Sequence, residues 1–159
     1  MTRDLTNADP APAGTLADVP PGWAAHTRRS PLTSPWEPLF TRLLPAEGGR
    51  APAVALALCV AEPHCNSRGF AHGGLVSALA DNAMGLSAVA AARAEGTSEI
   101  KGAVTVSLNL DFLDSARIGQ WLTIEPVVLR HGRTLAFTEC HVRADGQLVA
   151  RASATFRLG

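Results

Sequence analysis

The most informative stretch of the sequence reads Ala71-His72-Gly73-Gly74-Leu75-Val76-Ser77-Ala78-Leu79-Ala80-Asp81-Asn82-Ala83-Met84-Gly85. Two adjacent glycines before an apolar, alanine-rich run predict the start of a helix, where backbone N–H groups have no partner within the helix. The partial positive charge at such an end suits an oxyanion or a polarised carbonyl group. We expect the helix to end near Gly96.

Asp81 lies about two turns into this predicted helix, flanked by Leu79, Ala80, Ala83 and Met84. Burying a carboxylate among apolar neighbours is costly unless it is paired or hydrogen-bonded. Asp81 is therefore a candidate functional group. The alternative is an ordinary helix residue that faces solvent or pairs with an arginine.

The composition excludes several classes of protein. A chain of 159 residues is long enough for one domain with a hydrophobic core. Its 14 basic and 14 acidic residues balance, without a long basic run, so neither nucleic acid nor an anionic membrane is an expected partner. Three cysteines without a CxxC pair argue against a disulfide framework, and the first residues lack a signal-peptide core. We expect a cytoplasmic protein.

The apolar run from about Leu75 to Ala94 is long enough to test as a membrane span. Asp81, Asn82, two serines and many alanines make insertion unfavourable. A helix that is apolar on nearly all sides is instead predicted to be surrounded by protein.

The N-terminal third divides into a leader and two short elements. Residues 1–34 are rich in proline and alanine and are predicted to form a loosely ordered leader, followed by a single domain over 35–159. Ser34 and Pro35 are predicted to start a short helix that ends at Pro45. The run from Ala53 to Glu62 has strand length, although its alanines and leucines leave a helix as an alternative.

Four strands are predicted after the long helix. Residues 104–112 alternate between apolar and polar side chains, which predicts a strand with Thr105 on its polar face. Residues 121–130 form the next, where Pro126 implies a bulge or an edge position. Residues 135–144 and 147–158 pair across Asp145-Gly146, a typical hairpin turn. This order predicts an α+β fold in which an antiparallel sheet wraps around one long central helix, with a short N-terminal helix.

With these elements in place, residues 50–158 resemble the hotdog-fold acyl-CoA thioesterases, specifically the phenylacetyl-CoA thioesterase-like branch of the 4-hydroxybenzoyl-CoA thioesterase superfamily. The matching motifs are Asn-Ser-Arg-Gly-Phe-Ala-His-Gly-Gly at 66–74, Leu-Ala-Asp-Asn-Ala at 79–83, the strand 104–110 and the stretch 132–137. The resemblance implies hydrolysis of an acyl-CoA to a free acid and coenzyme A, with no metal and with coenzyme A as part of the substrate rather than a cofactor.

The resemblance also implies roles for individual residues. The backbone N–H of Gly73 would polarise the thioester carbonyl with help from Asn66, and Asp81 would act as nucleophile or as general base for water. Thr105 would help to hold that water. His72 is placed with this group, as a residue that orients the loop or transfers a proton.

The phosphates of coenzyme A lead us to expect basic residues at the mouth of the site. The candidate substrate-binding residues are Gly74, Arg68, Arg130, Arg133 and Thr134. For each arginine, a solvated loop residue is an equally good interpretation. Phe70, Phe112 and Phe137 are candidates for lining an arylacetyl or a medium-chain acyl pocket.

The spacing of Gly73 and Asp81 predicts an assembly. Eight residues of helix separate them by about 12 Å, which is too far for one carbonyl group to contact both. An antiparallel second copy of the helix would bring Asp81 of one subunit to Gly73 of the other. We therefore expect a homodimer at minimum, and a homotetramer built as a dimer of dimers.

Three alternatives stand beside hydrolysis at Asp81. The first is a hotdog module that binds acyl-CoA without hydrolysing it, and the second is a dehydratase, whose Asp and His pair the sequence lacks. The third is a zinc site at His64, Cys65 and His72, whose spacing fits no four-ligand pattern. Cys65 as a nucleophile is similarly disfavoured.

Overall fold

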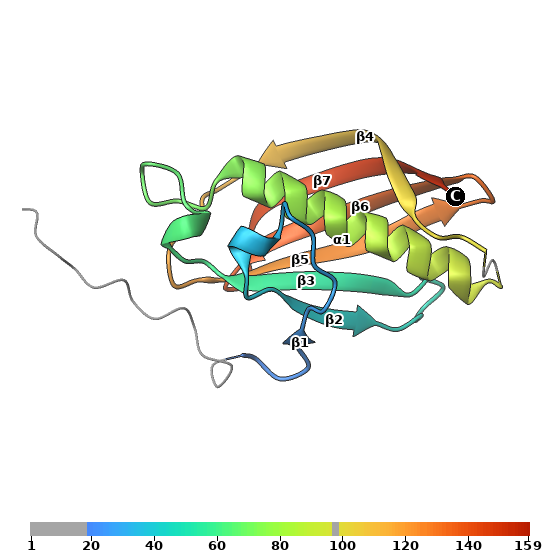
Figure 1. Cartoon of the computed structure of the whole chain (residues 1–159), viewed down its shortest axis with the longest axis horizontal. Helices are drawn as coiled ribbons and strands as arrows, with labels where there is room; N and C mark the ends of the chain where they lie inside the picture. Colours follow the sequence, from blue (N-terminus) through green and yellow to red (C-terminus); the bar gives the residue numbers. More distant parts are fainter. Residues whose placement is uncertain (1–18, 97–98) are drawn as a thin grey trace, which may run out of the picture.

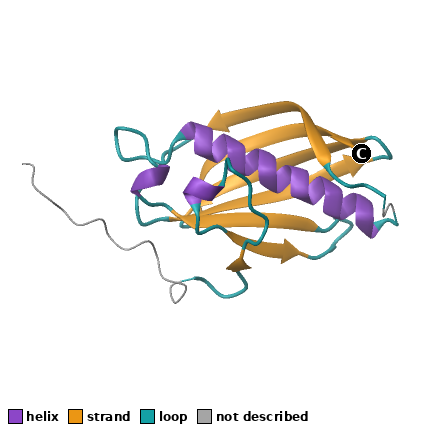
Figure 2. Ribbon diagram, viewed as in Figure 1, coloured by secondary structure: helices purple, strands orange, loops and turns teal. Residues whose placement is uncertain are grey.

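The computed structural model describes residues 19–96 and 99–159. In this part of the chain one long helix lies across one face of a seven-stranded sheet (Figures 1 and 2). The helix is α1 (Gly73–Ala94). The strands are β1 (Ala24–Ala25), β2 (Phe40–Leu44), β3 (Ala53–Cys59), β4 (Ala103–Phe112), β5 (Trp121–His131), β6 (Leu135–Ala144) and β7 (Gln147–Leu158), and two 3₁₀ turns are η2 (Ser34–Trp36) and η3 (Glu62–His64).

The strands are ordered β1-β2-β3-β5-β6-β7-β4, and all neighbours are antiparallel. The helix α1 contacts β3, β5, β6, β7 and β4. Its small residues allow this close approach: a Cβ atom added at Gly85 would lie 3.2 Å from the ring of Phe156, which is fully buried. The predicted architecture of an antiparallel sheet around one long helix is confirmed.

The length and apolarity of α1 have a structural explanation. It is long and apolar enough to cross a membrane, yet 56% of its apolar 18-residue stretch is buried within the chain. The buried positions include Leu79, Ala80 and Met84, which are part of the main core. Burial by protein accounts for the run, as predicted.

The predicted short helix from Ser34 to Pro45 is wrong. Only Ser34–Trp36 forms a 3₁₀ turn, while Phe40–Leu44 is strand β2 and pairs with β3 from Phe40 opposite Ala57 to Leu44 opposite Ala53. Pro38 lies inside the helical pattern, where it lacks an N–H donor and disfavours a helical conformation at the preceding residue. Pairing with β3 provides the backbone N–H and C=O groups with the hydrogen bonds that a helix would otherwise provide.

Part of the predicted leader joins the sheet. Ala24 and Ala25 form β1, which pairs with Thr41 and Phe40 of β2. The ring of Trp23 packs edge-on against Trp121, with 5.8 Å between ring centroids. Residues 1–18 of the predicted leader lie outside the described residues, and the division of the chain at residue 34 stays a prediction.

The strand predictions for the C-terminal half hold. The hairpin of β6 and β7 turns at Asp145 and Gly146, whose φ angles of 47° and 85° are those that a tight two-residue turn requires. Pro126 lies just beyond Ile124, where the pairing of β5 with β3 stops, so it occupies an edge position on that side. The interval from Ala53 to Cys59 is a strand, which removes the helical alternative.

Candidate active site

The N-terminal end of α1 leaves one amide available. His72 occupies the N-cap position, and its Nδ1 accepts a hydrogen bond from the Gly74 N–H at 2.9 Å. This places the ring proton on Nε2 and engages the Gly74 amide. Within the described residues no group accepts from the Gly73 N–H, which as the first amide of the helix has no intrahelical acceptor. Of the two glycine amides, Gly73 is therefore the one placed to bind a carbonyl oxygen.

Asn66 organises the loop that leads to this amide. Its side-chain Oδ1 accepts from the backbone N–H groups of Arg68 at 2.9 Å and Phe70 at 3.3 Å. The loop's far end is held where the His72 N–H donates to the His64 carbonyl at 2.8 Å. The donor of the Asn66 side chain is its Nδ2 group, which is the group that can assist at a carbonyl oxygen.

Asp81 and Thr105 come together from different elements. The Thr105 Oγ1 on β4 donates to Asp81 Oδ1 on α1 at 2.7 Å. Asp81 is half-buried on the side of α1 that faces this edge strand. The contact joins two of the predicted catalytic residues into one group and holds the carboxylate in a fixed orientation.

A β-bulge makes that contact possible. Thr105 pairs with Phe156 and Ser107 pairs with Thr155, so Val106 is an extra residue on β4. The prediction that Thr105 shares a polar face with Ser107 is wrong, because the bulge turns Thr105 toward α1. No glycine marks the bulge in the sequence.

The other predicted residues fall into two separate places. Arg68 lies in the exposed loop at the N-terminal end of α1. Arg130, Arg133 and Thr134 are exposed at the opposite end of the helix, where His131 Nε2 approaches Glu95 Oε1 at 3.3 Å. Gly73 and Asp81 lie on one continuous helix, so the separation of about 12 Å stands. One chain does not bring these groups to a single point.

Two contacts near the site are not predictable from the sequence. The Phe112 ring lies against Gly73, where an added Cβ would be 3.2 Å from Cζ. His64 is buried, its Nδ1 accepts from the Ala61 N–H at 2.9 Å, and its Nε2 lies 3.2 Å from the Trp36 carbonyl oxygen. Burial lowers the pKa of His64 below its usual value. An isolated histidine in a loop sequence gives no signal of such a role.

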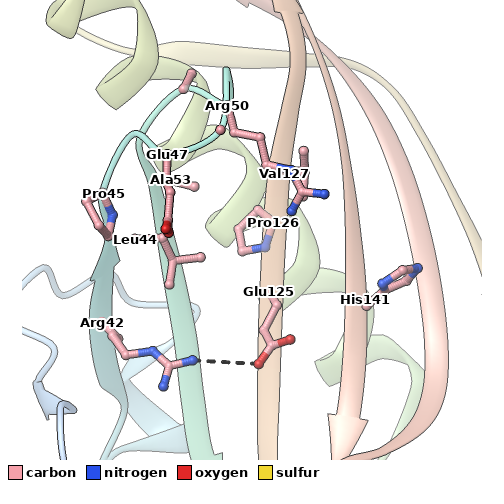
Figure 3. Close-up of a pocket in the computed structure, with 12 residues that line it drawn as sticks. Arg42, Leu44, Pro45, Glu47, Arg50, Ala53, Glu125, Pro126, Val127 and His141 are labelled. Carbon is pink, nitrogen blue, oxygen red and sulfur yellow. Dashed lines mark ion pairs between the residues drawn. The ribbon is translucent and has the colours of Figure 1, made fainter.

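A cavity of about 650 Å³ lies away from all of these residues (Figure 3). The cavity opens where β5 separates from β3. An ion pair between Arg42 Nη2 and Glu125 Oε1, at 3.7 Å, spans it. None of the predicted site residues lines it. The candidate active site is instead an open surface along α1 and β4.

Comparison with known proteins places this arrangement in a family. The thioesterase superfamily matches residues 68–150, just over half of the chain. A Pseudomonas aeruginosa protein provisionally named esterase PA0474 is 38% identical over 143 residues, which cover 90% of this chain and 99% of that protein. Human acyl-coenzyme A thioesterase 13 is 35% identical over 103 residues, which cover 63% of this chain and 69% of that protein.

Solved structures agree with the sequence matches. Zebra fish thioesterase superfamily member 2 is similar with a TM-score of 0.62 and 31% identity, over 75% of this chain and 81% of that one. The protein smu.793 from Streptococcus mutans, whose structure holds acetyl CoA, has a TM-score of 0.61 and 27% identity, over 75% and 88%. The chain belongs to the thioesterase superfamily and is a thioester hydrolase with the hotdog fold.

Proposed function

We propose that this hydrolase cleaves acyl-CoA thioesters into a free acid and coenzyme A, with Asp81 as the reacting carboxylate. The main support for this proposal is the hydrogen bond of 2.7 Å that Thr105 donates to Asp81. Asp81 lies on the same helix that begins with the available Gly73 amide. Human acyl-coenzyme A thioesterase 13, a relative by sequence, supports the substrate class. The reaction needs no cofactor, and we keep the cytoplasm as the proposed location.

Gly73 and Asn66 form the proposed carbonyl-binding half of the site. Negative charge develops on the thioester oxygen as its carbonyl carbon is attacked, and a fixed donor at that oxygen contributes about 3–4 kcal/mol to lowering the barrier. The Gly73 N–H is such a donor, and Asn66 Nδ2 is the second candidate. His72 acts here by holding the Gly74 amide, which fixes the first turn of α1.

Asp81 and Thr105 form the proposed attacking half. Thr105 donates its one hydroxyl proton to Oδ1, which leaves Oδ2 free to react. In one route Oδ2 attacks the carbonyl carbon, the coenzyme A thiolate leaves, and water hydrolyses the resulting anhydride. In the other, Oδ2 takes a proton from water, and the hydroxide attacks the carbonyl carbon to release the same thiolate.

The two halves meet, in our proposal, across a homodimer. The separation of about 12 Å between Gly73 and Asp81 requires a second chain, and β4 offers an edge for one. Among the residues that the structure describes, β4 pairs only with β7, and it exposes Val104 (69%) and Val106 (62%). A homotetramer built from two such dimers remains part of the proposal.

The same dimer geometry would let the two separate groups of predicted substrate-binding residues contact one coenzyme A molecule. With Asp81 opposite the partner's Gly73, the C-terminal end of one α1 extends about 20 Å beyond the Gly73 of the other subunit. Arg130, Arg133 and Thr134 would then lie toward the phosphate-bearing end of a bound coenzyme A, while Arg68 and Gly74 border the thioester end. Arginine suits phosphate because it donates two parallel hydrogen bonds.

Removal of the reactive carboxylate tests the proposal. We expect Asp81→Asn, which keeps the size of the side chain, and Asp81→Ala to lower turnover of acyl-CoA by several orders of magnitude, measured as free thiol released. Light scattering should show the same assembly as the wild type. Activity near that of the wild type in either variant contradicts the role of Asp81.

Membership of the thioesterase superfamily disfavours the alternative of a module that binds acyl-CoA without hydrolysing it. That alternative predicts tight binding of acyl-CoA without release of thiol. A panel of acyl-CoA substrates separates the two. In a single turnover in ¹⁸O-labelled water, label in the Asp81 carboxylate identifies the anhydride route, because water that attacks the anhydride at the Asp81 carbonyl carbon leaves its oxygen there.

A further inference from the structure

Phe112 is the aromatic side chain that borders the available amide. A Cβ built on Gly73 would lie 3.2, 3.5 and 3.8 Å from three carbons of the Phe112 ring, so the ring occupies the space above this residue. The φ angle of Gly73 is not in the left-handed region, so room for the ring accounts for a glycine here. A carbonyl oxygen that accepts from the Gly73 N–H therefore lies close to this ring.

Phe70 and Phe137, the other two candidates for lining the acyl pocket, are placed differently. Phe70 packs under the Arg117 guanidinium, 4.9 Å from the ring centroid. Phe137 pairs with Thr155 on the sheet face that turns away from α1. Only Phe112 combines contact with Gly73 and a largely uncovered ring, 55% exposed.

We infer that Phe112 is a specificity-determining residue whose ring receives the acyl group of the thioester, so that the preferred substrates carry an apolar acyl group larger than acetyl. This rests on the proposed function. The acyl group and the pantetheine arm leave the carbonyl in different directions, and only one can cover the ring. An apolar acyl group gains from burying this surface, whereas the amides of pantetheine lose hydrogen bonds to water there.

The test is a comparison of kcat/KM for acetyl-CoA, hexanoyl-CoA and phenylacetyl-CoA with the full-length protein. Phe112→Ala is expected to lower kcat/KM for the two larger substrates by about tenfold or more, mainly through KM, and that for acetyl-CoA by less than about threefold. Phe112→Leu, which keeps an apolar side chain, should restore much of the loss for hexanoyl-CoA.

Leu113→Ala is the matched control, because Leu113 is the next residue along the chain and is also 55% exposed. Its ratio of hexanoyl-CoA to acetyl-CoA activity should equal that of the wild type. Light scattering on each variant checks the assembly.

Three results overturn the inference. The first is an equal loss on all three substrates in Phe112→Ala, which marks a ring that only supports Gly73. The second is wild-type kcat/KM on all three substrates in that variant, and the third is dissociation of its assembly. A wild-type protein that releases thiol from none of the three contradicts the proposed function itself. The two failures are thus distinguishable.

Discussion

Thr105 is the residue whose contact defines the candidate site most directly. Its hydroxyl donates to the Asp81 carboxylate at 2.7 Å, and hydrogen bonds to charged groups contribute about 1.5–3 kcal/mol. Thr105→Val keeps the shape of the side chain but removes the donor. We expect kcat to fall by about tenfold to hundredfold, and Thr105→Ser to recover most of it. Equal activities for the valine and serine variants would show that the hydroxyl is not used.

His64 gives a prediction for stability against pH. Burial lowers its pKa in the folded chain, although the backbone contact with Trp36 opposes this. The unfolded chain therefore takes up the proton first as the pH falls below about 6.5, and folding stability is lost from there down toward the folded pKa.

Urea unfolding of wild type and His64→Gln between pH 7.5 and about 5 measures this effect. The variant should show a shallower loss of stability on the acid side. His26, whose pKa is also lowered by burial, should account for part of the remaining slope, which His26→Gln would remove. A slope that is the same in wild type and both variants contradicts the assignment.

At the scale of elements, the bulge in β4 decides which face carries the hydroxyl. With Val106 as the extra residue, Thr105 lies on the α1 face and pairs with Phe156. The double variant Thr105→Val with Val106→Thr keeps the composition and moves the hydroxyl by one position. We expect it to be as inactive as Thr105→Val alone.

Deletion of Val106 is the complementary variant. Without Val106, Ser107 follows Thr105 directly, and the two residues pair with the consecutive residues Thr155 and Phe156. The strand becomes regular, and Thr105 still faces α1. This variant should fold and retain more activity than the double variant. The reverse order of activities, measured by thiol release, would show that the bulge does not set the orientation of Thr105.

The helices and strands differ in how well local sequence patterns predict them. The helix from Gly73 and the hairpin at Asp145-Gly146 were predictable because glycines and turn residues mark them locally. Strand β2 was not, because Leu43 and Leu44 have helical spacing from Phe40 and only pairing with β3 decides the outcome. The bulge was not predictable either, since it depends on register against β7 rather than on any residue within β4.

For the whole molecule, the predicted sheet around one helix is confirmed, and the candidate site is resolved into separate groups. The sequence placed Gly73 and Asp81 on one helix, and the structure keeps them there. It could not indicate that Phe112 covers Gly73 or that His72 engages the Gly74 amide, since both depend on side-chain directions. We propose that each site takes Asp81 from one subunit and Gly73 from another.

Two inactive variants with complementary defects can test that claim. Gly73→Pro removes the N–H at the first helical position, where proline is tolerated, and His72 already has the extended ψ of 133° that a following proline requires. Gly73→Ala is its control, because it adds a similar contact with Phe112 but keeps the N–H. The second variant is Asp81→Ala.

The decisive measurement is the thioesterase activity of an equal mixture of Gly73→Pro and Asp81→Ala chains, unfolded and refolded together. Random pairing makes half of the dimers mixed, and each mixed dimer holds one complete site of two, so about a quarter of the wild-type activity should return. If mixed dimers form, as shown by mass-tagged chains, and the mixture stays inactive, Gly73 and Asp81 do not meet across a subunit interface.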